Sequence, residues 1–236
     1  MALSPCRPYT VRGARRDLSD PRARSLVNIM KEFAGIPSEQ KPTHLALENV
    51  EGFARSEARL RLLELLQAND YRLLEILLCP TDLGIPSRRP RYYLAASRLP
   101  LRERRAFPSP ETKSLADYLD PALARNIPHE LLVSPEIIGK FGDGLRILDV
   151  TVPGSYTTCF TSGYGKSIMH AGSYLRHGTV VRRFSPEEIA KLLHFPAGFT
   201  FPRDMSPRAK WRLVGNSLSV VAVREVLAAF PAIQAA

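Results

Sequence analysis

Cysteine is scarce in this chain of 236 residues, which contains only three: Cys6, Cys79 and Cys159. An odd and scattered set of this kind forms neither a disulfide framework nor a four-cysteine metal site, and it indicates a reducing compartment, the cytoplasm or the nucleus. No stretch reaches the roughly 18 consecutive apolar residues of a membrane span, and too few apolar residues precede Pro5 for a secretory signal. His170 and His194 have no metal-ligating residues at a useful spacing, so we expect no metal site.

Negative charge is also in deficit. The chain has 33 Lys and Arg residues against 23 Asp and Glu, which gives a net charge of +10. This excess suits a polyanionic partner and favours nucleic acid, although an arginine-rich genome would produce the same composition. The hydrophobic fraction of 44% and the charged fraction of 24% are ordinary for a globular protein. The length suffices for one substantial core or for one domain with an inserted lobe.

A positioned cysteine stands near the start of the chain, where Pro5 and Pro8 flank Cys6. Proline fixes φ, so the two prolines restrict the loop and can aim the thiol. Four arginines follow closely and favour the reactive thiolate: Arg7, Arg12, Arg15 and Arg16. Cys6 is therefore a candidate nucleophile, and the alternative is a small buried apolar side chain.

The first hundred residues alternate between helical and strand patterns. Asp20 as N-cap and Pro21 at the first helical position begin a helix that Gly35 and Pro37 end. The further predicted elements are a strand at 44–47 with a polar tip at 48–50, a helix at 56–68 whose leucine-rich face includes Leu60, and strands at 71–78 and 91–96. This alternation predicts an α/β sheet with crossover helices, in which functional groups gather at the carboxyl ends of strands.

The remainder of the chain is less regular. Between about Leu99 and Val181, turn signals and two glycine-rich stretches at 139–144 and 163–172 predict a separate, irregular lobe. Regular structure returns where Ser185 and Glu188 form a capping-box pattern at the start of a helix. A last helix is predicted at residues 218–229.

Four short motifs occur in order along the chain: Pro5-Cys6, Glu48-Asn49-Val50, Arg89-x-Arg91 and Gly215-Asn216-Ser217. With a variable lobe between the third and the fourth, this order resembles the cytosine-5 methyltransferase family. Residues 158–165, Thr-Cys-Phe-Thr-Ser-Gly-Tyr-Gly, are similar to an element of the Dnmt2 group, which methylates a cytosine in the anticodon loop of tRNA. The resemblance covers nearly the whole chain, and it makes tRNA of the tRNA-Asp type the expected partner, with DNA as the alternative.

The resemblance implies an α/β fold, a partial Rossmann-like S-adenosylmethionine-dependent methyltransferase sheet with an inserted target-recognition lobe. Residues 1–99 would form the C-terminal half of the catalytic domain, residues 100–182 the target-recognition lobe, and residues 183–236 the return to the catalytic domain. The N-terminal half of that domain, with the family's Phe-x-Gly-x-Gly-Gly cofactor loop, is absent from this sequence. We therefore expect no measurable methyl transfer from the 236-residue chain alone, and a non-catalytic RNA-binding remnant is an alternative function.

The resemblance also implies a covalent mechanism, in which Cys6 adds to carbon 6 of cytosine and activates carbon 5 toward the methyl group of S-adenosylmethionine. Glu48 would hold N3 and the exocyclic amine, a role that needs a raised pKa, and Arg89 and Arg91 would orient the base. The residues assigned to the cofactor are Asn216 and Ser217, and those assigned to the substrate are Thr10, Asn49, Cys159, Phe160 and Thr161.

Each assignment has a simpler alternative. Glu48 suits an ordinary strand-end carboxylate, and the two arginines suit a solvated basic edge. Asn216 suits a turn, and Cys159 suits a packed thiol. The nucleophile loop also departs from the family pattern, because one proline before the cysteine is missing and Arg7 replaces a glutamine. A shift of the thiol by an ångström can cost about 100-fold in rate.

Overall fold

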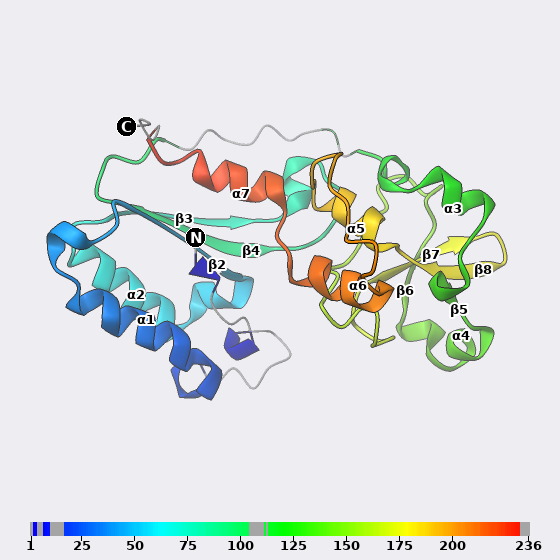
Figure 1. The fold of residues 1–236 in the computed structure, drawn as a ribbon, viewed down its shortest axis with the longest axis horizontal. Coiled ribbons are helices and arrows are strands. Elements are labelled where there is room, and N and C mark those ends of the chain that lie inside the picture. The colour runs from blue at the N-terminus through cyan, green and yellow to red at the C-terminus, as the bar shows by residue number, and fades with distance from the viewer. Residues whose placement is uncertain (1, 4–6, 10–16, 104–110, 112, 232–236) are drawn as a thin grey trace. The chain divides into compact units, whose positions relative to one another are not determined.

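The computed structural model describes residues 2–3, 7–9, 17–103, 111 and 113–231, and all structural statements refer to these residues. The chain divides into two compact units (Figure 1). Unit 1 comprises Met1–Leu78, Pro90–Ala106 and Arg224–Ala236, and unit 2 comprises Cys79–Arg89 and Phe107–Val223. Among the described residues, no helix is long and apolar enough to cross a membrane.

Unit 1 is built on a four-stranded sheet with the strand order β1-β2-β4-β3. The strands are β1 (Ala2–Leu3), β2 (His44–Val50), β3 (Arg72–Leu78) and β4 (Arg91–Ser97). β1 pairs with β2 in parallel, whereas β4 runs antiparallel to both of its neighbours. Helices α1 (Arg24–Gly35) and α2 (Glu57–Gln67) lie side by side on one face of the sheet (Figure 1). The predicted alternation of strands and helices is confirmed, and the sheet is mixed.

Helix starts in unit 1 follow their capping residues. Asp20 accepts a hydrogen bond from the backbone N–H of Arg22 at 2.9 Å, and Pro21 occupies the first position of the short 3-10 turn that leads into α1. At α2, Ser56 accepts from the Arg59 N–H at 3.0 Å. The prediction that Leu60 shares the buried face of α2 is wrong, because its side chain is 52% exposed while Leu62 and Leu66 are buried. Leu60 and Leu62 are two positions apart, which corresponds to a rotation of about 200° around the helix axis, so their side chains point to opposite faces.

Unit 2 holds a second four-stranded sheet with the order β5-β8-β7-β6. Its strands are β5 (Leu132–Val133), β6 (Arg146–Leu148), β7 (Ser173–His177) and β8 (Val180–Arg183). Its helices are α3 (Pro121–Arg125), α4 (Pro135–Phe141), α5 (Pro186–Leu192) and α6 (Pro207–Asn216). The last helix, α7 (Val220–Leu227), crosses the boundary between the two units.

The start of α5 confirms the predicted capping box. The Ser185 hydroxyl accepts from the Glu188 N–H at 3.1 Å, and the Glu188 carboxylate accepts from the Ser185 N–H at 2.9 Å. Helix α6 was not predicted, although Ser206 caps it and Pro207 stands at its first position. Residues 183–223 cluster with unit 2 by their contacts. The predicted division into catalytic and recognition domains stays a prediction.

Candidate active site

A buried ion pair joins two of the predicted catalytic residues within unit 1. Glu48 lies near the carboxyl end of β2 and Arg91 begins β4. The strand register places them diagonally, because Arg91 stands opposite Val50. The Glu48 Oε1 atom lies 3.0 Å from the Arg91 Nε atom, and the side chains are 4% and 13% exposed. Diagonal cross-strand neighbours of opposite charge attract, and at this burial either charge would be costly to leave alone.

The predicted nucleophile belongs to the segment that follows β1. Leu3, the last residue of β1, pairs with Glu48 of β2. Cys6 itself lies outside the described residues, as does the predicted substrate residue Thr10. Cys6 follows Leu3 by three positions, a reach of at most about 11 Å for a fully extended chain.

Asn49, predicted to contact substrate, is completely buried. Its Oδ1 atom accepts a hydrogen bond from the Val50 N–H at 2.8 Å. Its Nδ2 atom has no hydrogen-bond partner in the described part of the chain. A buried amide that holds the backbone at the end of β2 supports the geometry of the neighbouring Glu48, and direct contact with substrate stays a prediction.

Arg89 joins three of the sequence motifs within unit 2. Its guanidinium donates to the Cys159 sulfur at 3.0 Å and to the Phe160 carbonyl at 2.9 Å. It also donates to the carbonyls of Gly215 and Ser217 at 3.2 and 2.6 Å. Five donors in a fixed planar fork suit arginine to such a junction. Arg89 therefore holds the Cys-Phe-Thr element against the Gly-Asn-Ser motif, and its predicted contact with the base stays a prediction.

The Gly-Asn-Ser motif ends α6 beside the Cys-Phe-Thr element. A Cβ atom at Gly215 would overlap the backbone of Thr161, so only glycine permits this approach. Asn216 is exposed, whereas Ser217 is half-buried and its hydroxyl donates to the Leu213 carbonyl at 2.9 Å. The two residues predicted to contact the cofactor thus lie at the end of a helix that is packed on the substrate-binding candidates.

The element at residues 158–165 serves packing as well. Phe160 is 4% exposed, and its ring lies edge-on to Tyr164 with centroids 4.9 Å apart. The Tyr164 hydroxyl donates to the Ser173 carbonyl at 2.6 Å and accepts from the Phe184 N–H at 3.0 Å. Cys159 is half-buried and Thr161 is exposed. Of the predicted substrate residues in this element, Thr161 has the most accessible side chain.

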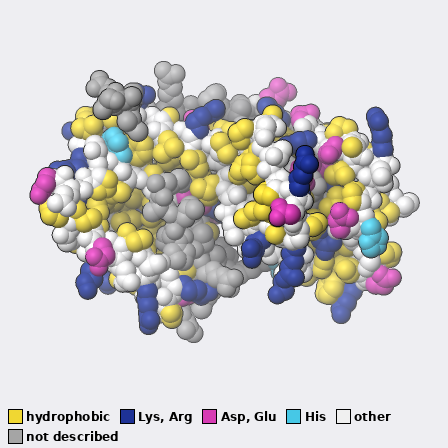
Figure 2. Space-filling model, in the orientation of Figure 1, with side chains coloured by type: hydrophobic (Ala, Val, Ile, Leu, Met, Phe, Trp, Pro, Cys, Tyr) yellow, Lys and Arg dark blue, Asp and Glu magenta, His cyan; other side chains and the backbone are white. Residues whose placement is uncertain are grey.

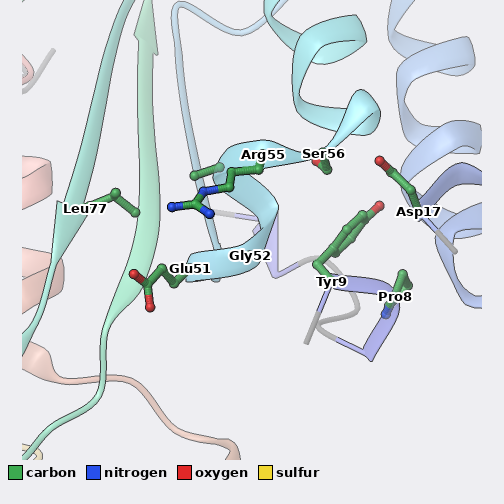
Figure 3. Close-up of a pocket in the computed structure, with 9 residues that line it drawn as sticks. Pro8, Tyr9, Asp17, Glu51, Gly52, Arg55, Ser56 and Leu77 are labelled. Carbon is green, nitrogen blue, oxygen red and sulfur yellow. The ribbon is translucent and has the colours of Figure 1, made fainter. Parts of the chain in front are cut away.

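A polar cavity of about 360 Å³ lies in unit 1 beside the turn that follows Cys6. Tyr9, Asp17 and Ser56 line one side of it, and Glu51, Arg55 and Leu77 line the other (Figure 3). Gly52 brings the two sides together, since a Cβ atom there would overlap the Tyr9 carbonyl oxygen. The segment after the Glu-Asn-Val motif therefore touches the segment after the Pro-Cys motif. Gly52 was not among the predicted site residues, although a glycine two residues past a strand end is a usable signal.

The side chain of Tyr9 places a polar hydroxyl group in the protein interior. It is 5% exposed, and its hydroxyl has no hydrogen-bond partner among the described residues. Burial, with smaller contributions from Asp17 and Asp20, raises the pKa of the Tyr9 hydroxyl to about 12. The folded protein therefore retains a proton that the unfolded chain releases near pH 10, and stability falls as the pH rises from about 10 to about 12.

Replacing Tyr9 by phenylalanine is expected to remove part of this alkaline instability. At pH 7 the variant should be at least as stable as the wild type, because a buried hydroxyl without a partner costs free energy. Between pH 10 and 12 it should gain about 1–3 kcal/mol relative to the wild type. Urea unfolding followed by far-ultraviolet circular dichroism at several pH values measures this, with Tyr156→Phe in unit 2 as a control. If the free energy of unfolding changed with pH in the same way for Tyr9→Phe and wild type, the prediction would be contradicted.

Positive charge is spread over the surface. On the face shown in Figure 2, Lys and Arg side chains occur on both units and do not gather in a single patch. Within the described ranges, no group of three or more His, Cys, Asp or Glu side chains could hold a metal ion.

Comparison with known proteins connects this arrangement to a family. A family model described as C-5 cytosine-specific DNA methylase matches residues 1–231. The tRNA (cytosine(38)-C(5))-methyltransferase of Schizosaccharomyces pombe is 28% identical, over 94% of this chain and 73% of the relative.

Two solved structures share the fold. A methyltransferase of Entamoeba histolytica superposes with a TM-score of 0.84 at 25% identity, over 96% of this chain and 74% of the other. The S. pombe Dnmt2 methyltransferase superposes with a TM-score of 0.78 at 26% identity, over 97% and 76%. The matched family and the shared fold agree with the motif order that the sequence displays. The chain therefore belongs to the C-5 cytosine-specific DNA methylase family, the S-adenosylmethionine-dependent cytosine-5 methyltransferases.

Proposed function

We propose that this protein methylates carbon 5 of a cytosine in the anticodon loop of a tRNA of the tRNA-Asp type, through a covalent adduct with Cys6. The observation that carries the proposal is the buried pair of Glu48 and Arg91, in which Glu48 belongs to the strand that pairs with Leu3, three positions before Cys6. The relative from S. pombe, named as a tRNA cytosine-38 methyltransferase, supports the substrate class.

Each step of the proposed reaction assigns a task to this chain's own residues. The Cys6 thiolate forms a bond to carbon 6 of the ring, and the displaced electron pair makes carbon 5 nucleophilic. Glu48, held by Arg91, contacts N3 and the exocyclic amine and favours the electron shift. After carbon 5 has gained the methyl group, loss of its proton and expulsion of the Cys6 thiolate restore the aromatic ring.

S-adenosylmethionine, when bound, supplies an electrophilic methyl group on its sulfonium sulfur. Asn216 fits a contact with this donor, because its amide is exposed at the end of α6 and offers both donor and acceptor atoms. The Ser217 hydroxyl donates to the Leu213 carbonyl, which leaves its oxygen lone pairs able to accept. We assign these two residues to the wall of the donor site.

RNA is the favoured nucleic acid. The target base has to leave its stack to reach the Cys6 thiol, which costs less for an unpaired loop nucleotide than for a base in a duplex. The net charge of +10 suits either polyanion. DNA remains the competing substrate because the matched family is described by DNA methylation.

The proposal is tested with a tRNA-Asp transcript whose cytosines carry tritium at carbon 5. Addition of a thiolate to carbon 6 labilises that hydrogen, so release of tritium to water reports the first step even without methyl transfer. A second assay uses S-adenosylmethionine with a labelled methyl group, and compares the transcript with a uracil-38 transcript and with duplex DNA. We expect tritium release only with the cytosine-38 transcript and, because the sequence has no Phe-x-Gly-x-Gly-Gly cofactor loop, no measurable label transfer by the 236-residue chain alone.

Other outcomes of these assays separate the alternatives. Label in DNA alone would contradict the tRNA assignment. Tight tRNA binding with neither tritium release nor methyl transfer would favour the non-catalytic RNA-binding alternative. Tritium release without methyl transfer would show that Cys6 chemistry is intact and that the donor site is the missing part.

A further inference from the structure

A second cavity, lined by aromatic side chains, lies within unit 2. It encloses about 410 Å³, inside the range of roughly 300–1,000 Å³ that small-molecule sites occupy. Five aromatic rings contribute to its wall: Tyr118, His194, Phe195, Phe199 and Phe201. None of the four sequence motifs contributes a residue to this wall.

Three of these rings form a continuous aromatic surface. The centroids of Phe195 and Phe199 lie 4.7 Å apart, and those of Phe199 and Phe201 lie 5.0 Å apart. Phe199 is 40% exposed, in a loop that follows α5. A large apolar ring left partly in water costs free energy, so an exposed aromatic surface inside a cavity points to a ligand.

The polar part of the wall is mixed in character. Tyr118 is 6% exposed, and in the described part of unit 2 its hydroxyl has no hydrogen-bond partner. A buried hydroxyl of this kind is costly unless a ligand or water pairs with it. Lys113, Asp117, Glu187 and Lys191 complete the rim. The Glu187 carboxylate also pairs with Lys210 at 3.3 Å, so the rim carries charges of both signs and offers a ligand both donors and acceptors.

We propose that this cavity binds a single unstacked nucleobase of the RNA substrate, a base other than the target cytosine. A nucleobase has two flat apolar faces that stack on Phe199 and its neighbours. Its edge carries donors and acceptors that pair with carboxylates, ammonium groups and a phenol hydroxyl. The adjoining phosphate would contact Lys191 at the rim. This inference rests on the proposed function, since it takes the substrate to be RNA.

The wall fits a base better than it fits a peptide. A groove for an apolar or proline-rich segment requires aromatic or aliphatic walls. Such a segment would form no favourable contact with the four charged groups around this cavity. Stacking also depends on the aromatic face of the ring, whereas apolar docking depends only on area. Substitutions at Phe199 therefore distinguish the two occupants.

The test measures binding of the full chain to a fluorescein-labelled tRNA-Asp transcript by fluorescence anisotropy. We expect F199A and F199L to weaken binding by about 10-fold or more, because both lose the stacking face, and F199Y to stay within about twofold of wild type. Val180→Ala, at another partly exposed apolar position of unit 2, is the matched control and should not change the affinity. K191A should reduce the slope of log affinity against log salt concentration by about one, which corresponds to the loss of one phosphate contact.

Each result has a defined consequence. Wild-type affinity in all three Phe199 variants would overturn the base site. Weak binding by F199A with wild-type binding by F199L would indicate apolar docking and would also overturn it. If the wild-type chain bound no tRNA at all, the proposed function itself would fail. The fluorescence of Trp211, the single tryptophan and a buried residue of unit 2, reports whether each variant is folded.

Discussion

Cys6→Ser is expected to lower tritium release by about 10³-fold or more. A serine hydroxyl is protonated at neutral pH and is a much weaker nucleophile than a thiolate, so the ring would not be activated. Binding of tRNA should change by less than about twofold, because one oxygen replaces one sulfur and the Lys and Arg side chains of the protein stay the same. The assays described for the proposed function provide the measurement, together with anisotropy for binding.

Cys79→Ser is the matched control for this change. The Cys79 sulfur is half-buried in unit 2, where it accepts a hydrogen bond from the Arg89 N–H at 3.3 Å, and a serine hydroxyl can accept the same bond. Activity of the control should therefore stay near that of the wild type. Retention of tritium release by Cys6→Ser would show that another residue attacks the ring.

Glu188→Ala is expected to lower the stability of unit 2 by about 3–5 kcal/mol. Glu188 is completely buried and accepts two hydrogen bonds from the Arg182 guanidinium, both at 2.8 Å. It also accepts from the backbone N–H groups of Asp120 at 3.1 Å and Ser185 at 2.9 Å. Its removal leaves a buried guanidinium without its carboxylate, and the N–H groups of Asp120 and Ser185 without this acceptor.

The neighbouring Glu187 is a natural control, because its side chain is 53% exposed and forms an ion pair with Lys210 at 3.3 Å. Glu187→Ala should cost less than about 1 kcal/mol, as exposed ion pairs do. Urea unfolding followed by the fluorescence of Trp211 measures both variants. Equal midpoints for the two variants would contradict the assigned role of Glu188.

Much of the local structure could be predicted from residue patterns. Asp20 with Pro21 and Ser185 with Glu188 begin helices because their side chains satisfy N–H groups that lack partners at a helix start. The strands of unit 1 followed from their apolar runs. Helix α6 was not predicted because it follows directly after the turn signals of residues 196–206, although Ser206-Pro207 marks its start.

The candidate site was predicted as a set of motifs and not as a geometry. Arg89 and Arg91 stand two positions apart in one motif, yet their partners differ completely. Arg91 pairs with Glu48 in unit 1, and Arg89 holds the backbone of unit 2 around Phe160 and Gly215. Spacing along the chain does not reveal this, because each partner comes from a segment far away in sequence.

The sequence by itself determined the family, through the order of the Pro-Cys, Glu-Asn-Val, Arg-x-Arg and Gly-Asn-Ser motifs, and it determined the types of residue available for the chemistry. Only the tertiary structure decided which of these residues pair, because burial and strand register depend on contacts between distant segments. It also decided why Gly52 and Gly215 are glycines, since in both places another part of the chain occupies the space of a side chain. The aromatic cavity around Phe199 likewise exists only in the folded chain.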